Sequence, residues 1–159
     1  MESTAVCASS PESNPYRAEL ARALGAEAVL DPADPKIQEK LRDLTGGVGV
    51  DAAVDCSGVK DAQRILIGAA RRKGEVAFVG EGGELPILVS DDMIRKGLTL
   101  RGSWHYPLHG TPKLMRIIRE TAASLNKLIT HVFPMADVGK AFELQLTGKC
   151  AKVVLHPWG

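Results

Sequence analysis

The feature that most constrains the fold lies at residues 48–80, where two short apolar runs flank a segment of helical periodicity. The first run ends in Cys56, Ser57 and Gly58, and the second ends in Gly80. Two apolar strands joined by one helix form a βαβ unit, whose strands are parallel. Runs this rich in Val and Ala, with little alternation, predict a sheet covered on both faces. Ligands of such sheets bind at the carboxyl ends of the strands.

The rest of the chain repeats this alternation of strands and helices, which predicts the α/β class. Asp34 is the expected cap of one helix, with Pro35 at its first position, and Thr111 is the expected cap of another. Further strands are predicted at residues 4–8, 26–30, 86–89, 98–103, 129–133 and 153–155. Helices are predicted at residues 16–24, 36–44, 112–123 and 137–146, with one turn at 90–96.

Composition favours a small aliphatic domain. Apolar residues make up 45% of the 159 residues and aromatic residues only 4%, so the core must consist mostly of Ala, Val, Leu and Ile. The 20 basic and 19 acidic side chains nearly cancel, which argues against nucleic-acid binding. Neither a membrane span nor a secretory signal is expected. The three cysteines lack CxxC spacing, so we expect a reducing cytoplasm.

Five segments carry a family resemblance, in register from about residue 5 to residue 155. They include Thr45-Gly46-Gly47-Val48-Gly49-Val50-Asp51 and Lys73-Gly74-Glu75-Val76-Ala77-Phe78-Val79-Gly80, and the others are residues 17–27, 98–103 and 133–154. Together they resemble the medium-chain dehydrogenase/reductase superfamily, which includes the zinc-type alcohol, polyol and threonine dehydrogenases. The resemblance covers the C-terminal half of such an enzyme, including most of its cofactor-binding domain.

The departures from this family are as informative as the matches. The family's cofactor domain opens with a strand and a GxGxxG turn that holds the pyrophosphate, and this sequence has no such motif. Gly46-Gly47-Val48-Gly49 is no substitute, because it precedes a strand. The resemblance therefore implies an incomplete, doubly wound, Rossmann-like parallel sheet that lacks its first strand. Residues 1–125 would form the partial dinucleotide-binding domain, and residues 126–159 would return to the catalytic domain.

An incomplete sheet leaves strand edges open, and open edges are prone to pairing. We expect the chain to close the sheet by pairing its remaining strands directly or by forming a homo-oligomer, for example a dimer. The family's catalytic zinc ligands lie upstream of residue 1, so zinc is expected only in the missing half. The resemblance thus implies cofactor-domain walls of an NAD(P)-dependent alcohol or polyol dehydrogenase, with little activity alone. The alternative is a non-catalytic α/β module for self-association or for nucleotide or partner binding.

Several residues match family positions beside the cofactor. Cys56 and Ser57 match a turn that borders the adenine and the nicotinamide ribose, although Cys56 could equally be a buried small hydrophobe. Ser103 matches the nicotinamide-side wall, although a turn serine explains it as well. The residues that match the turn flanking nicotinamide are Val79, Gly80 and Glu81.

The choice between NAD and NADP stays open. Ser9 and Ser10 stand where the family often has an acid that bonds the adenosine ribose, and with Arg17 they could accept the NADP phosphate. Glu12 could instead supply the acid. Lys152 matches a basic position near the pyrophosphate, or is a surface lysine.

The four histidines suggest no catalytic set. His105 and His109 are four residues apart, a spacing that binds metal when both lie on one helix. Pro107 lies between them and Gly110 follows, which favours a loop. No Ser/His/Asp or Cys/His group can be argued from the sequence.

Overall fold

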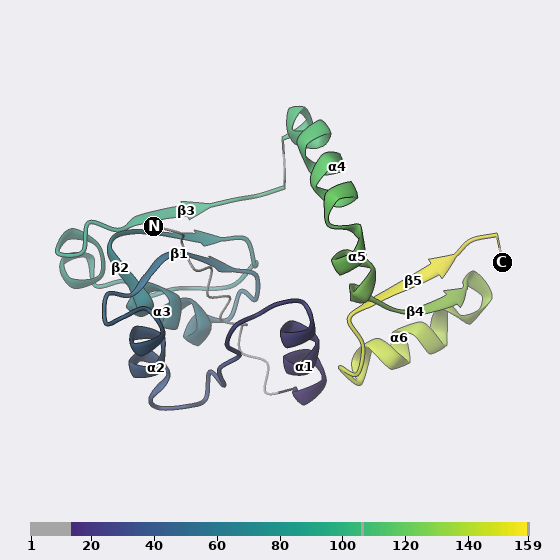
Figure 1. The fold of residues 1–159 in the computed structure, drawn as a ribbon, viewed down its shortest axis with the longest axis horizontal. Helices are drawn as coiled ribbons and strands as arrows, with labels where there is room; N and C mark the ends of the chain where they lie inside the picture. The colour runs from purple at the N-terminus through teal and green to yellow at the C-terminus, as the bar shows by residue number, and fades with distance from the viewer. Residues whose placement is uncertain (1–13, 106, 159) are drawn as a thin grey trace. The chain divides into compact units, whose positions relative to one another are not determined.

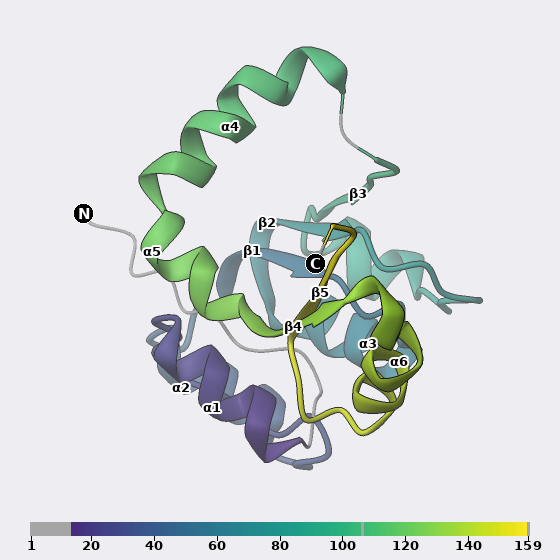
Figure 2. The same cartoon turned by 90° about the vertical axis from the view of Figure 1, so that its right-hand side faces the viewer.

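The computed structural model describes residues 14–105 and 107–158, which form two units (Figures 1 and 2). The first unit takes in residues 26–105, and the second takes in residues 14–25 and 107–158. No helix in the described ranges is long and apolar enough to cross a membrane.

The first unit is built on a three-stranded parallel sheet with the order β1-β2-β3 (Figure 1). The strands are β1 (Val50–Asp55), β2 (Ala70–Phe78) and β3 (Thr99–Gly102). Helix α3 (Lys60–Ala69) connects β1 to β2. The predicted βαβ unit and the α/β class are therefore confirmed.

The core of this unit lies on the face of the sheet that α3 covers. Ile67 of α3 and Val76 of β2 are fully buried, and Leu98 packs with them. The opposite face carries Val54, which is 58% exposed, and Arg101, which is also exposed. The predicted cover of this second face stays a prediction. Only one face has a covering helix among the described residues of the unit.

Two predicted strands are absent. Residues 26–30 have no strand assignment, and among the described residues no strand pairs with them. Residues 86–88 are irregular and lead into a π-helical turn at Val89–Ile94. Their backbone groups are satisfied by side chains instead of a strand ladder: Arg64 bonds the carbonyl of Pro86, and Asp92 accepts the N–H of Leu88.

Helix α2 (Ile37–Leu44) begins later than the sequence predicts. The side chain of Asp34 accepts the N–H of Lys36 at 2.8 Å, which closes a turn ahead of the helix. The residue that caps α2 is therefore Lys36, and the prediction of Asp34 as the cap is wrong. Leu41 is the buried residue of this helix.

The second unit contains a two-stranded parallel sheet in which α6 (Val138–Leu146) joins β4 (Ile129–Pro134) to β5 (Lys152–His156). All three elements were predicted within a residue or two. Ala141 of α6 and Cys150 are buried in this unit.

The remaining helices of this unit are α1 (Pro15–Ala23), α4 (Thr111–Glu120) and α5 (Ala122–Leu125). Asn14 caps α1 by accepting the N–H of Tyr16, and it also donates to the carbonyl of Gly148 at 2.8 Å. The predicted cap Thr111 is instead the first residue of α4, and Gly110 precedes it without a side-chain bond. Short 3-10 turns lie at Leu108–Gly110, Asn126–Leu128 and Met135–Asp137.

Candidate functional site at the carboxyl ends of the strands

The turns that follow β1 and β2 lie in direct backbone contact. A Cβ atom added to Gly80 would come within 2.3 Å of the amide nitrogen of Gly58, and one added to Gly82 within 2.2 Å of its carbonyl oxygen. No real Cβ occupies such positions, so only glycine allows this approach. Gly58 itself has φ +69°, the left-handed region that favours glycine. The two turns that the sequence indicated, at residues 56–58 and 79–82, therefore lie side by side, and together they are called the rim.

Asp55, the last residue of β1, holds this rim together. Asp55 is 2% exposed, and its carboxylate accepts hydrogen bonds from the Ser57 amide at 2.9 Å and the Ser57 hydroxyl at 2.7 Å. The same carboxylate accepts the Gly58 amide at 3.1 Å and the Gln63 side-chain amide at 2.8 Å. Its main-chain carbonyl accepts the amides of Val79 and Gly80. One residue thus ties both turns and α3 together.

Sequence reasoning missed Asp55 as a functional residue. The available signal was an Asp directly before a small-residue turn, because Asp side chains bond the backbone two residues on. Gln63, a polar residue of α3, is 7% exposed because it faces this carboxylate.

The ionisation of Asp55 follows from the same contacts. Burial disfavours the charged carboxylate, but the hydrogen bonds from Ser57, Gln63 and Gly58 favour it more strongly. The pKa of Asp55 therefore lies below its ordinary value of 3.8. The carboxylate is a permanent acceptor at neutral pH, and this keeps the donors of the rim fixed.

The predicted contact residues of the first turn have different accessibility. Cys56 is exposed with a free thiol, so the alternative of a buried hydrophobe is wrong. The Ser57 hydroxyl donates its proton to Asp55 and accepts the amide of Val59 at 3.1 Å. Ser57 can therefore offer a ligand only an acceptor.

The predicted residues of the second and third strands reach the same edge. Val79 is 51% exposed, Gly80 is half-buried and Glu81 is exposed. The amide of Ser103 donates to the carbonyl of Phe78 at 3.0 Å, which continues the β2–β3 ladder past the end of β3. Ser103 thus lies beside the end of β2.

Not every candidate belongs to the unit that contains this rim. Arg17 lies in α1 and Lys152 begins β5, so both belong to the second unit. Ser9, Ser10 and Glu12 lie outside the described residues. His105 has φ +58° and lies outside any helix, which agrees with the loop interpretation.

A pocket of about 380 Å³ lies beside the rim, over the ends of β2 and β3. One of its lining residues, Gln63, is also the partner of Asp55. The lining residues are Gln63, Phe78, Gly80, Gly82, Gly83, Leu85, Ile87, Leu100, Arg101 and Gly102.

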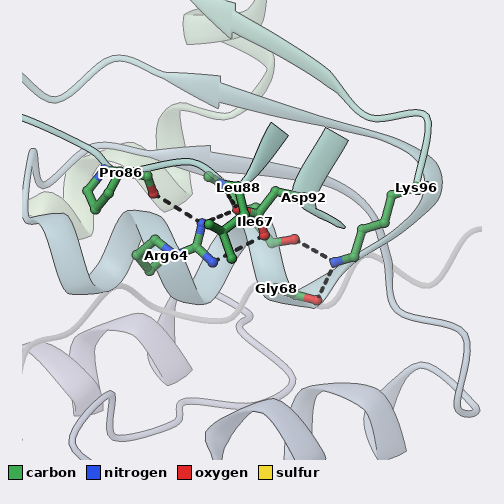
Figure 3. A network of polar contacts seen from close by, with 7 residues as sticks. All are labelled: Arg64, Ile67, Gly68, Pro86, Leu88, Asp92 and Lys96. Atoms are coloured by element: carbon green, nitrogen blue, oxygen red, sulfur yellow. Dashed lines mark hydrogen bonds and ion pairs between the residues drawn. The ribbon is translucent and has the colours of Figure 1, made fainter. Parts of the chain in front are cut away.

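The ion pair between Arg64 and Asp92 holds residues 86–88 in place, and Ile87 of this segment lines the pocket (Figure 3). Arg64 of α3 contacts Asp92 through both carboxylate oxygens, at 2.7 and 3.1 Å, and also bonds the carbonyl of Pro86 at 3.3 Å. Asp92 in turn accepts the amide of Leu88 at 2.8 Å. The hydrogen bond from Arg64 outweighs burial and lowers the pKa of Asp92 below 3.8.

Lys96 closes the carboxyl end of α3 (Figure 3). Its ammonium group donates to the carbonyls of Ile67 and Gly68, each at 2.9 Å. A cation at this end also complements the helix dipole. Burial lowers the pKa of Lys96, and the positive charges of Arg42 and Arg64 add to that effect, whereas Asp92 opposes it.

The described residues do not provide a metal centre. Across residues 14–105 and 107–158, no group of three or more His, Cys, Asp or Glu side chains could hold a metal ion. A family zinc ion therefore does not fit the part of the chain that the structure describes.

Comparison with known proteins identifies the family. The model described as zinc-binding dehydrogenase matches residues 6–120. L-threonine 3-dehydrogenase of Caldanaerobacter subterraneus is 32% identical over 145 residues, which cover 89% of this chain and 42% of that protein. Another threonine dehydrogenase, from Burkholderia multivorans, is 31% identical over 89% of this chain and 42% of its own length.

Solved structures agree with this comparison. An alcohol dehydrogenase from Thermotoga maritima superposes with a TM-score of 0.81 and 27% identity, over 90% of this chain and 41% of that one. 2R,3R-butanediol dehydrogenase from Bacillus subtilis superposes with a TM-score of 0.81 and 25% identity, over 92% of this chain and 42% of that one. This chain spans about two-fifths of the length of these relatives. The resemblance inferred from sequence is confirmed, and the chain belongs to the zinc-binding dehydrogenase family.

Proposed function

We propose that this chain supplies the cofactor-facing walls of an NAD(P)-dependent alcohol or polyol dehydrogenase. The observation that supports this most directly is the rim, where Asp55 joins the turns after β1 and β2 at the carboxyl ends of parallel strands. Open parallel sheets bind their ligands at this edge. The residues that would face the dinucleotide there are Cys56, Ser57, Val79, Gly80, Glu81 and Ser103.

The same proposal gives roles in the domain organisation and in cofactor binding to residues outside the rim. Residues 1–125 would form the partial dinucleotide-binding domain, and residues 126–159 would belong with the catalytic domain. Ser9, Ser10 and Arg17 would select NAD or NADP, and Lys152 would lie near the pyrophosphate. In the whole enzyme, zinc would polarise the substrate oxygen and nicotinamide would accept hydride.

We further propose that the isolated chain binds the dinucleotide weakly and does not transfer hydride. The sequence has no GxGxxG turn to hold the pyrophosphate, and the described residues have no donor set for zinc. A dinucleotide that contacts only the residues of the rim lacks the charge-assisted hydrogen bonds that hold a diphosphate. We therefore expect dissociation constants in the millimolar range.

Calorimetric titration of the 159-residue chain with NAD and with NADP tests this proposal. Gly80→Ala should abolish the binding, because the added Cβ forces the two turns apart, whereas Gly83→Ala should leave it unchanged, because a Cβ there meets nothing within 4 Å. The absence of any heat with both dinucleotides would instead support a non-catalytic α/β module. Alcohol oxidation by the purified chain would contradict the proposed inactivity.

We also propose that the chain forms a homo-oligomer through its sheet edges and resides in the cytoplasm. Among the described residues, β1 ends the sheet on one side, and Val54 of β1 is 58% exposed. Open edges favour pairing with a second copy. Sedimentation velocity over a range of concentrations should show a dimer, and a monomer at every concentration would contradict this. Cell fractionation tests the location.

A further inference from the structure

The pocket beside the rim has apolar walls. Its floor and sides are formed by Phe78 and Leu100 of the sheet and by Leu85 and Ile87 of the segment that the Arg64–Asp92 pair fixes. A volume of about 380 Å³ is within the lower range of small-molecule sites, on the order of 300–1,000 Å³. The pocket can therefore hold a ring system of one or two rings.

Gln63 is the uncharged polar side chain of the lining. Gln63 is 7% exposed and lines the pocket, and its amide nitrogen donates to Asp55 at 2.8 Å. A carboxylate accepts only, so this contact fixes which side-chain atom is nitrogen and leaves the oxygen Oε1 on the other side. Among the described residues Oε1 has no hydrogen-bond partner. Since none of their fully buried polar side-chain atoms lacks a partner, Oε1 must reach the surface.

The charge around the pocket selects what this oxygen can bind. The ionised Asp55 polarises the Gln63 amide and strengthens Oε1 as an acceptor. Arg101, the charged residue of the lining, is drawn towards Glu75, 3.4 Å away. On the side of Oε1, an anion would be repelled by the nearby Asp55 carboxylate and by the oxygen itself. A neutral ligand with an N–H or O–H donor therefore fits best.

We propose that this pocket is a binding site for a neutral aromatic ring that carries one N–H or O–H donor, with Gln63 Oε1 as its acceptor. The ring packs between Phe78, Leu85, Ile87 and Leu100, and the donor satisfies an oxygen that the protein itself leaves unpaired. This combination of an apolar body and a single polar contact is typical of ligand sites that fix orientation. The proposal needs no dinucleotide and goes beyond the proposed function.

The test compares indole with 1-methylindole, which keeps the rings and lacks the N–H. The uniformly ¹⁵N-labelled full chain is titrated with each probe without dinucleotide, and shifts are followed at the side-chain amide of Gln63 and the backbone amides of Gly82 and Gly83. Indole should give saturable shifts there. 1-Methylindole should bind roughly fivefold more weakly, which corresponds to the loss of one neutral hydrogen bond.

Gln63→Met provides the matched variant, because it preserves the size of the side chain and removes the acceptor. In this variant the two probes should bind equally. Equal affinity of both probes in the unaltered chain, or the absence of saturable shifts at these three residues, would overturn the proposal. The comparison in the unaltered chain decides the question even if Gln63→Met disturbs the fold.

Discussion

The side chains of Asp55 and Gln63, residues that are 2% and 7% exposed, form a hydrogen bond of 2.8 Å. It connects the end of β1 to the first turns of α3, and so fixes the helix relative to the rim. A buried carboxylate with four donors is stable only while it remains an acceptor. The geometry of the rim therefore depends on the negative charge of the buried Asp55 carboxylate.

Asp55→Asn should destabilise the chain by about 2–3 kcal/mol, because the new NH₂ group faces donors that need an acceptor. The free energy of unfolding in urea measures this change. Asp61→Asn is the matched control: Asp61 is an exposed acid in the first turn of the same helix, and its loss should cost only about 0.5 kcal/mol of dipole interaction. Similar losses in both variants would contradict the assigned role of Asp55.

The stability of the chain should fall as the solution is acidified below the ordinary carboxyl range. Asp55 and Asp92 both have pKa values below 3.8 in the folded chain, so the folded state binds their protons less readily than the unfolded state. Their contribution is fully present above the unfolded pKa and is lost as the pH falls through the folded pKa. Urea unfolding between about pH 7 and pH 2 should show this loss.

A charge-free variant checks the assignment of this pH dependence. Asp55→Asn should flatten the fall in unfolding free energy below pH 4, because residue 55 then no longer titrates. An unaltered pH profile in this variant would assign the acid sensitivity to other carboxylates.

Much of the fold could be predicted because its signals are local. The apolar runs around Val54 and Val76 and the helical spacing of Ala62 and Ala69 identify the βαβ unit directly. Residues 86–89 were predicted as a strand because they are mostly apolar, and this prediction is wrong. What decides their structure is a pair of side chains, Arg64 and Asp92, that are 28 residues apart.

The candidate site was only partly predictable for a related reason. Cys56, Ser57 and Gly80 follow strands and could be placed at one edge by the rule for parallel sheets. Asp55 and Gln63 look like ordinary polar residues in the sequence. Their importance arises from burial against each other, which no spacing within a single segment reveals.

Gly80→Ala should destabilise the chain by about 2 kcal/mol or more, because the added methyl group overlaps backbone atoms that cannot move independently. The nearest are the amide nitrogens of Gly58 and Ser57, at 2.3 and 2.6 Å. Thermal and urea unfolding measure the loss.

Gly83→Ala separates this overlap from the general effect of replacing glycine. Open space surrounds a Cβ at Gly83, so the substitution should be neutral or slightly stabilising, by up to about 1 kcal/mol, through the lower entropy of the unfolded chain. An unchanged stability of Gly80→Ala would show that the turns are not in the contact described.

The Arg64–Asp92 pair should contribute a measurable coupling energy. Its geometry is bidentate and Asp92 is mostly buried, although a third of the Arg64 side chain is exposed to solvent, which screens the pair. A double-mutant cycle of Arg64→Ala and Asp92→Ala, read by urea unfolding, should give about 1–2 kcal/mol. Arg64→Lys should recover less than half of it, because lysine cannot bond both oxygens in a fixed fork.

Arg95 and Asp91 form the matched control for this cycle. They pair four residues apart in the same segment, but their side chains are 74% and 57% exposed. Their coupling should be no more than about 0.5 kcal/mol, because solvent screens an exposed pair and both long side chains lose freedom in forming it. If the two cycles gave equal couplings, the wall of the pocket would be held by packing of Leu85 and Ile87 and not by the buried carboxylate.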